Sequence, residues 1–178
     1  TLVEGTLLIA GYDDTSGNDI TGLGTGTVTV SGEATLKTAG NVAPILTNDF
    51  FTEPGSTLHL NADNGDATLT IAGDISGSGD LTAYSRNNTK IVLSGDVDTT
   101  GEVSILAKST RKTTVQIGDG GTTGSLSAAR VYSDHYGALI YDHAAGHTAA
   151  MDVRYEGDGH FIKNGAGELE IKHPVRHT

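Results

Sequence analysis

The chain of 178 residues lacks cysteine and tryptophan altogether and has only three prolines. The absence of cysteine excludes a disulfide framework, a thiolate metal site and a cysteine nucleophile. Apolar residues make up 36% and aromatic residues 5% of the chain, which is less than a compact enzyme usually carries. No run approaches the roughly 20 apolar residues that a membrane-spanning helix needs. No signal-peptide pattern follows Thr1, and both ends of the sequence cut through the strand pattern, so we expect the chain to be a piece of a longer protein.

Positive charge is also scarce, because 11 Lys and Arg face 22 Asp and Glu, for a formal net charge of −11. This sign repels phosphate backbones and anionic lipid surfaces, so we expect no nucleic-acid partner. Five of the eleven cations nevertheless lie close in sequence. We interpret this cluster as a solvated face whose charges keep strands from pairing wrongly. Its members are Arg86, Lys90, Lys108, Arg111 and Lys112.

The sequence contains a short repeated phrase of apolar residues, glycine and aspartate. Leu69-Thr-Ile71-Ala-Gly-Asp-Ile75 is followed by Ile91-Val-Leu93-Ser-Gly-Asp-Val97 and then by Val115-Gln-Ile117-Gly-Asp119, with first positions 22 (91 minus 69) and 24 (115 minus 91) residues apart. Such a period predicts a coil in which each strand pairs with the same strand one turn later. Disorder is excluded because the apolar residues alternate, and the 25 glycines suit tight turns. We therefore predict an all-β parallel solenoid, as a single domain over residues 1–178.

Two segments depart from this rhythm. Residues 41–54 hold two of the three phenylalanines and two prolines, and we expect a side loop that packs back on the coil. Residues 127–156 hold four of the six tyrosines and three of the seven histidines, and we expect an irregular segment there. Because tyrosine offers flat apolar area with a polar tip, this segment is the predicted interaction surface. Local packing of an irregular turn is the alternative. The candidate residues are Tyr132, His135, Tyr136, Tyr141, His143 and His147.

Three stretches resemble a known family. Residues 157–171, Gly-Asp-Gly-His-Phe-Ile-Lys-Asn-Gly-Ala-Gly-Glu-Leu-Glu-Ile, resemble the G-x-G-x-φ-x-K-x-G-x-G-x-L-x-φ repeat of autotransporter passenger domains, where φ is apolar. Residues 4–9, with 23–30 and 34–36, resemble the partner half of this repeat. Gly137-Ala-Leu-Ile-Tyr-Asp-His143 resembles a phrase that often precedes it in passengers of the AIDA type. The middle of the chain matches only in period and composition.

The resemblance implies a right-handed parallel β-helix displayed outside a Gram-negative cell, on the surface or secreted, and tethered to an outer-membrane β-barrel outside this fragment. It implies a non-enzymatic adhesin or adhesin stalk, with roles in cell adhesion, biofilm formation and virulence. Expected partners are a surface protein or glycan of a host or neighbouring cell, or a second copy of the chain. In this family the later turns often act as an autochaperone that nucleates folding, which is an alternative function.

The sequence contains no complete catalytic or metal-binding motif, so we predict no enzyme activity, no metal and no cofactor. Ser78 lies between glycines but lacks the Gly-x-Ser-x-Gly pattern of a nucleophile. His143 and His147 would lie about 13 Å apart on a strand, at roughly 3.3 Å per residue, unless loop curvature brings them together with His135 or Asp142. A carbohydrate-active β-helix is the remaining alternative, and it requires two carboxylates roughly 5 to 9.5 Å apart. Two acidic clusters are interpreted as turn and solubility residues rather than calcium ligands: Asp13, Asp14 and Asp19, and Asn61, Asp63, Asn64 and Asp66.

Overall fold

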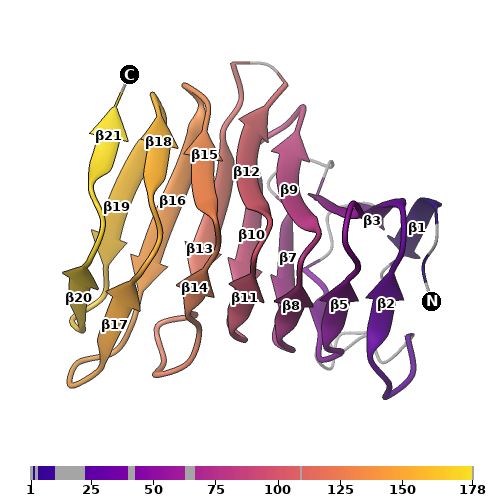
Figure 1. Cartoon of the computed structure of the whole chain (residues 1–178), viewed down its shortest axis with the longest axis horizontal. Coiled ribbons are helices and arrows are strands. Elements are labelled where there is room, and N and C mark those ends of the chain that lie inside the picture. The colour runs from indigo at the N-terminus through magenta and orange to yellow at the C-terminus, as the bar shows by residue number, and fades with distance from the viewer. Residues whose placement is uncertain are drawn as a thin grey trace.

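The computed structural model describes residues 2, 4–10, 23–39, 43–62, 67–108 and 110–177, and this part of the chain consists of strands and turns with no helix. The strands form three parallel sheets that run side by side along the long axis (Figure 1). Sheet A holds β2 (Val28–Val30), β5 (Phe50–Thr52), β8 (Ile75–Gly77), β11 (Val97–Thr99), β14 (Leu126–Ser127), β17 (Thr148–Met151) and β20 (Glu168–Ile171). Sheet B holds β1 (Gly5–Ala10), β3 (Glu33–Ala39), β6 (Thr57–Asn61), β9 (Asp80–Ser85), β12 (Glu102–Ala107), β15 (Arg130–Ser133), β18 (Tyr155–Gly157) and β21 (Val175–His177). Sheet C holds β4 (Ile45–Leu46), β7 (Thr68–Ile71), β10 (Thr89–Leu93), β13 (Thr113–Ile117), β16 (Gly137–Asp142) and β19 (His160–Asn164).

From β2 to β19 the chain visits the three sheets in the order A, B, C and returns, so that each such triplet makes one coil of a β-solenoid of about six turns. Neighbouring strands in each sheet come from successive coils. Ile91 pairs with Leu69 of the preceding coil and with Val115 of the next. These are the positions that the repeated phrase aligns, so the predicted parallel solenoid and its period are confirmed.

Inward side chains stack into apolar columns, one or two along each sheet. In sheet B, Leu58, Leu81, Val103, Val131 and Tyr155 lie in register and are all buried. A fully buried side chain of this size stabilises the fold by about 1.5 to 3 kcal/mol. The C-terminal coils fill the same core with rings, because the Tyr155 ring lies 5.7 Å from that of Phe161. Alternation of apolar residues thus creates one continuous core along the coil.

The Gly-Asp pair inside the repeated phrase builds the corner between sheets C and A. At Gly95 a Cβ would lie 2.3 Å from the carbonyl oxygen of Gly73, one coil away, so only glycine allows this close approach. Asp74 accepts a hydrogen bond from the backbone N–H of Asp96 at 2.8 Å, and Asp49 accepts one from that of Asp74 at 2.9 Å. We call these three carboxylates the aspartate ladder. Glycine lets the coils approach, and aspartate joins them.

Both segments expected to be irregular are regular. Phe50 is fully buried in sheet A and Phe51 points outward, so residues 45–52 belong to the coil and the predicted side loop is wrong. The strand β4 has two residues, which is too short for a period to show in the sequence. Residues 127–156 likewise contribute to β14 through β18 in register with their neighbours.

Candidate interaction surface

The six residues predicted to form an interaction surface fall into an exposed and an enclosed group. Tyr132 and Tyr136 are each 37% exposed, and the His135 side chain is 68% exposed. His135 and Tyr136 lie in the turn between β15 and β16, at the corner of sheets B and C, and Tyr132 lies on the outer face of β15 just before it. We call these three residues the aromatic corner. Tyr141 and His143 are fully buried, and His147 is half-buried. The structure therefore keeps half of the predicted surface together.

The aromatic corner is held in place by Asp134. One carboxylate oxygen of Asp134 accepts a hydrogen bond from the N–H of Tyr136 at 3.2 Å, and the other accepts one from the N–H of Ala107 in the preceding coil at 2.6 Å. The His135 and Tyr136 rings meet edge to face, with centroids 4.8 Å apart. His135 Nδ1 lies 3.4 Å from Asp158 Oδ2 in the next coil. A hydrogen bond to the preceding coil and a contact with the next thus hold the ring pair on the outside of the wall.

The assignment of Tyr141 and His143 to an exposed surface is wrong. Tyr141 occupies an inward position of β16, where its ring lies 6.0 Å from that of Phe161. Burial raises the pKa of Tyr141 above its ordinary value, and its hydroxyl has no hydrogen-bond partner among the described residues. His143 follows with the same parity, and its Nε2 lies 2.9 Å from the carbonyl oxygen of Gly124. Both side chains pack the core.

The separation expected for His143 and His147 on a strand does not apply, because loop curvature brings the two rings into a stack with centroids 4.8 Å apart. β16 ends at Asp142 and β17 begins at Thr148, so the chain turns between the two histidines instead of running straight. Among the described residues, no group of three histidine or acidic side chains is placed to hold a metal ion. Six residues of the two acidic clusters lie outside the described residues: Asp13, Asp14, Asp19, Asp63, Asn64 and Asp66. The seventh, Asn61, is buried at the end of β6.

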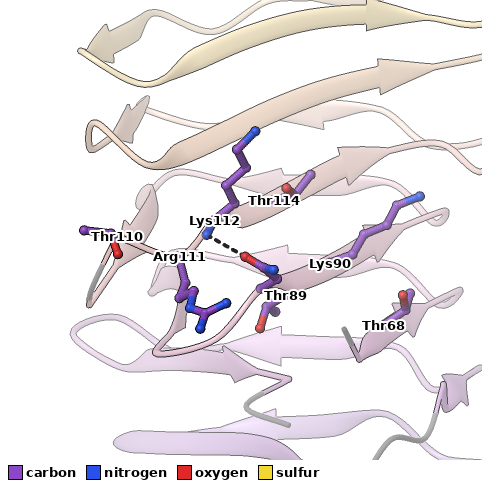
Figure 2. A pocket seen from close by; sticks show the side chains of 8 residues that line it. Thr68, Thr89, Lys90, Thr110, Arg111, Lys112 and Thr114 are labelled. Atoms are coloured by element: carbon purple, nitrogen blue, oxygen red, sulfur yellow. Dashed lines mark hydrogen bonds between the residues drawn. The ribbon is translucent and has the colours of Figure 1, made fainter. Parts of the chain in front are cut away.

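Three residues of the basic cluster line one groove on the outer side of sheet C. Lys90 comes from β10, and Arg111 and Lys112 come from the turn before β13. The groove has a volume of about 760 Å³, and the other residues that line it are Thr68, Asn88, Thr89, Thr110 and Thr114 (Figure 2). Lys108 points away to sheet B, where its Nζ lies 4.2 Å from the centroid of the Tyr84 ring. The coil therefore brings Lys90, Arg111 and Lys112 of the basic cluster to sheet C, whereas Lys108 lies on the other side of the corner, on sheet B.

A second groove, of about 420 Å³, lies on sheet B and was not anticipated from the sequence. It contains His59, whose ring meets that of Tyr84 edge to face at 5.6 Å. Burial lowers the pKa of His59, Glu33 opposes that change and Lys108 adds to it. The spacing of His59 and Tyr84 in the sequence, on successive strands of one sheet, is the signal that would have found this groove.

Two carboxylates on the outer face of sheet B, those of Glu102 and Glu156, form ion pairs. Arg130 contacts Glu102 at 2.5 Å and Glu156 at 3.4 Å, and Glu156 also contacts Arg154 at 2.5 Å. Glu102 raises the pKa of Arg130 by hydrogen bonding and charge. Arg130 therefore joins carboxylates of the preceding and the following coil.

No known protein family, no curated protein and no solved structure matches the chain. Within the part of the chain that the structure describes, no helix has the length and apolarity to cross a membrane.

Proposed function

We propose that the chain is a segment of an autotransporter passenger domain that serves, without catalysis, as an adhesin or adhesin stalk of a Gram-negative cell. It is exposed at the cell surface or released, and an outer-membrane β-barrel outside this fragment carries it. The stacked coils act as a stiff rod that holds an adhesive surface away from the membrane. The partner is a surface protein or glycan of another cell, or a second copy of the chain, and repeated weak contacts between cells add up.

The aromatic corner is the observation that carries this proposal. Tyr132 on β15 and His135 and Tyr136 in the following turn present rings to solvent, and Asp134 bonds this turn to the preceding coil. Rings held in this way lose little conformational entropy when a partner covers them, and tyrosine is enriched in binding hot spots. An exposed ring pair on a rigid wall is therefore suited to adhesion.

The residues of the family resemblance have a structural role that supports the same proposal. At Gly157 a Cβ would lie 2.0 Å from the carbonyl oxygen of Ser133, and at Gly165 it would lie 2.3 Å from that of His143. Both contacts join successive coils. These glycines of the passenger-like repeat thus occupy positions where successive coils stack closely.

A folding template is a second candidate, and the C-terminal coil favours it. Phe161, Leu169 and Val175 line the core there but are only partly buried, and Ile171 is 48% exposed. A partly covered apolar surface with unpaired strand edges is a template on which an adjoining coil can fold. This function requires no ligand.

Bead aggregation and adhesion to cells test the proposal. Beads coated with the whole chain are compared with beads carrying Tyr132→Ala, His135→Ala and Tyr136→Ala together. The control variant carries Phe51→Ala and Ile162→Ala, which remove apolar residues of similar exposure, 41% and 38%, from other faces. We expect adhesion to fall only in the first variant, with unchanged circular dichroism. Equal adhesion by all three proteins, or none by the wild type, would overturn the adhesive role and leave the folding template.

A further inference from the structure

We propose that the groove on sheet C binds an acidic polysaccharide, a chain of sugar units that carry carboxylate or sulfate groups, through Lys90 and Lys112. This site shares no residue with the aromatic corner, which lies one coil further along the same edge. The inference concerns binding by the purified chain, so it holds whether or not the aromatic corner is adhesive.

The groove gathers positive charge on a chain whose net charge is −11. Of the eight described residues that line the groove, three are cations and none is acidic. Neither the Lys90 nor the Lys112 ammonium forms an ion pair with a described residue, although acidic residues outnumber basic ones two to one in the sequence. Holding unneutralised cations together on neighbouring coils is unfavourable unless an anion joins them.

Strand register sets the spacing of these groups. Lys90 pairs with Thr68 on one side and with Thr114 on the other, so the three side chains form one outward column across β7, β10 and β13 (Figure 2). Lys112 lies two residues before Thr114, on the same outward face. Strands about 4.8 Å apart and an offset of about 6.6 Å along the strand place the two lysine Cα atoms about 8 Å apart.

The hydroxyl groups of this column favour a sugar as the anionic ligand. Within the described residues, the Thr68 and Thr114 hydroxyls make no hydrogen bond, so both can donate to and accept from a ligand. A column of hydroxyl, ammonium and hydroxyl matches a glycan, which alternates charged groups with hydroxyl groups.

A nucleic acid fits this groove less well. None of the described residues that line the groove is aromatic, whereas single-strand binders use base stacking on aromatic rings. The basic stretch is also short, because the next two coils place Asp134 and Asp158 at the same corner. A duplex needs cations along an extended path, whereas a few acidic sugar units need only this groove.

Fluorescence anisotropy with labelled probes tests the proposal on the whole chain. The probes are oligogalacturonate, dextran sulfate, neutral dextran and a double-stranded DNA oligomer. We expect the chain to bind at least one of the two acidic glycans, more weakly as salt rises, and neutral dextran not at all. Lys90→Gln with Lys112→Gln should lower the affinity about tenfold or more, because two charge-assisted contacts are lost. Lys90→Arg with Lys112→Arg should retain binding.

The control variant, Lys172→Gln with Arg176→Gln, removes two exposed cations from the C-terminal coil. Like the groove variant, it changes the formal net charge from −11 to −13, the loss of two positive charges. Its affinity for the glycan should stay close to that of the wild type. The proposal is overturned if no acidic glycan binds, if both glutamine variants lose affinity equally, or if DNA binds as tightly as the glycans. Loss of adhesion in the aromatic-corner variant with glycan binding intact would separate the two surfaces.

Discussion

Replacing Gly95 by alanine should destabilise the coil strongly, although alanine is usually better tolerated than glycine inside regular secondary structure. The new Cβ would lie 2.3 Å from the carbonyl oxygen of Gly73 and 2.6 Å from its carbonyl carbon. The coil below gives no room, because a Cβ at Gly73 would itself lie 2.1 Å from the carbonyl oxygen of Asn48. The contact falls about 1.1 Å short of the 3.4 Å at which ordinary van der Waals contact begins, so the two coils must separate at this corner.

The expected loss is about 3 kcal/mol. Overpacking that shifts backbone costs about 1 to 3 kcal/mol, and separating the coils also strains the 2.8 Å hydrogen bond from the Asp96 N–H to Asp74, which contributes about 1 kcal/mol. For a chain of this size each kcal/mol lowers Tm by about 2 to 4 °C, so Gly95→Ala should melt about 6 to 12 °C lower.

Gly120→Ala is the matched control. Gly120 has a φ of +89°, where alanine is strained, but nothing lies within 4 Å of its Cβ position. The expected loss of stability in Gly120→Ala is therefore only the cost of a positive φ at alanine, about 1 to 2 kcal/mol. Urea unfolding followed by circular dichroism, with Tm as a second measure, compares the two variants. If Gly95→Ala proved as stable as the wild type, or more stable than Gly120→Ala, close stacking would not be the reason for the glycine in the repeated phrase.

Three further predictions concern single side chains. Asp74→Ala should lower the free energy of unfolding by about 1 kcal/mol, because the Asp96 N–H loses its acceptor. Asp74→Asn keeps an oxygen there, so its loss should be less than half as large. Equal losses for the two variants in urea unfolding would exclude the hydrogen bond of the aspartate ladder as the cause. Tyr141→Phe should retain or raise stability, because the buried hydroxyl has no partner among the described residues. The raised pKa of Tyr141 means that wild-type stability falls as pH rises above the ordinary value of 10, since only the unfolded chain ionises there, and melts from pH 9 to 11 should show a smaller fall for the variant. Because the pKa of His59 is lowered in the folded chain, its neutral side chain contributes stability above the ordinary pKa of 6.5, and this contribution declines as pH falls below that value. His59→Gln should therefore flatten the dependence of Tm on pH between 7 and 5. An unchanged slope would show that His59 is not its origin.

The sequence carried the fold because the same positions recur in every coil. The 22- and 24-residue spacings place Leu69, Ile91 and Val115 in one column, and the structure pairs them as the spacing requires. Alternation also held information about Tyr141 that remained unused. Leu139 aligns with Val115 and is buried, so position 141, two residues on, faces inward as well. Because residues 127–156 were predicted to be irregular, this alternation was not applied to Tyr141.

Other features depend on contacts between coils and were beyond the reach of single-sequence patterns. The two-residue strand β4 shows no period, so residues 41–54 read as a loop. The stacking of His143 on His147 depends on the course of a turn, which spacing alone does not fix. The groove at Lys90 and Lys112 likewise requires the register of β10 and β13. Sequence therefore predicted what repeats, whereas the surfaces arise from what differs between coils.

The location of the chain tests the central proposal most directly. An antibody raised against the purified chain is applied to intact and to permeabilised cells that naturally produce the chain, and labelling is measured by flow cytometry together with the amount of chain in the medium. A surface-displayed or released passenger segment predicts equal labelling of intact and permeabilised cells, or chain in the medium. Labelling that appears only after permeabilisation, with none of the chain in the medium, would contradict it.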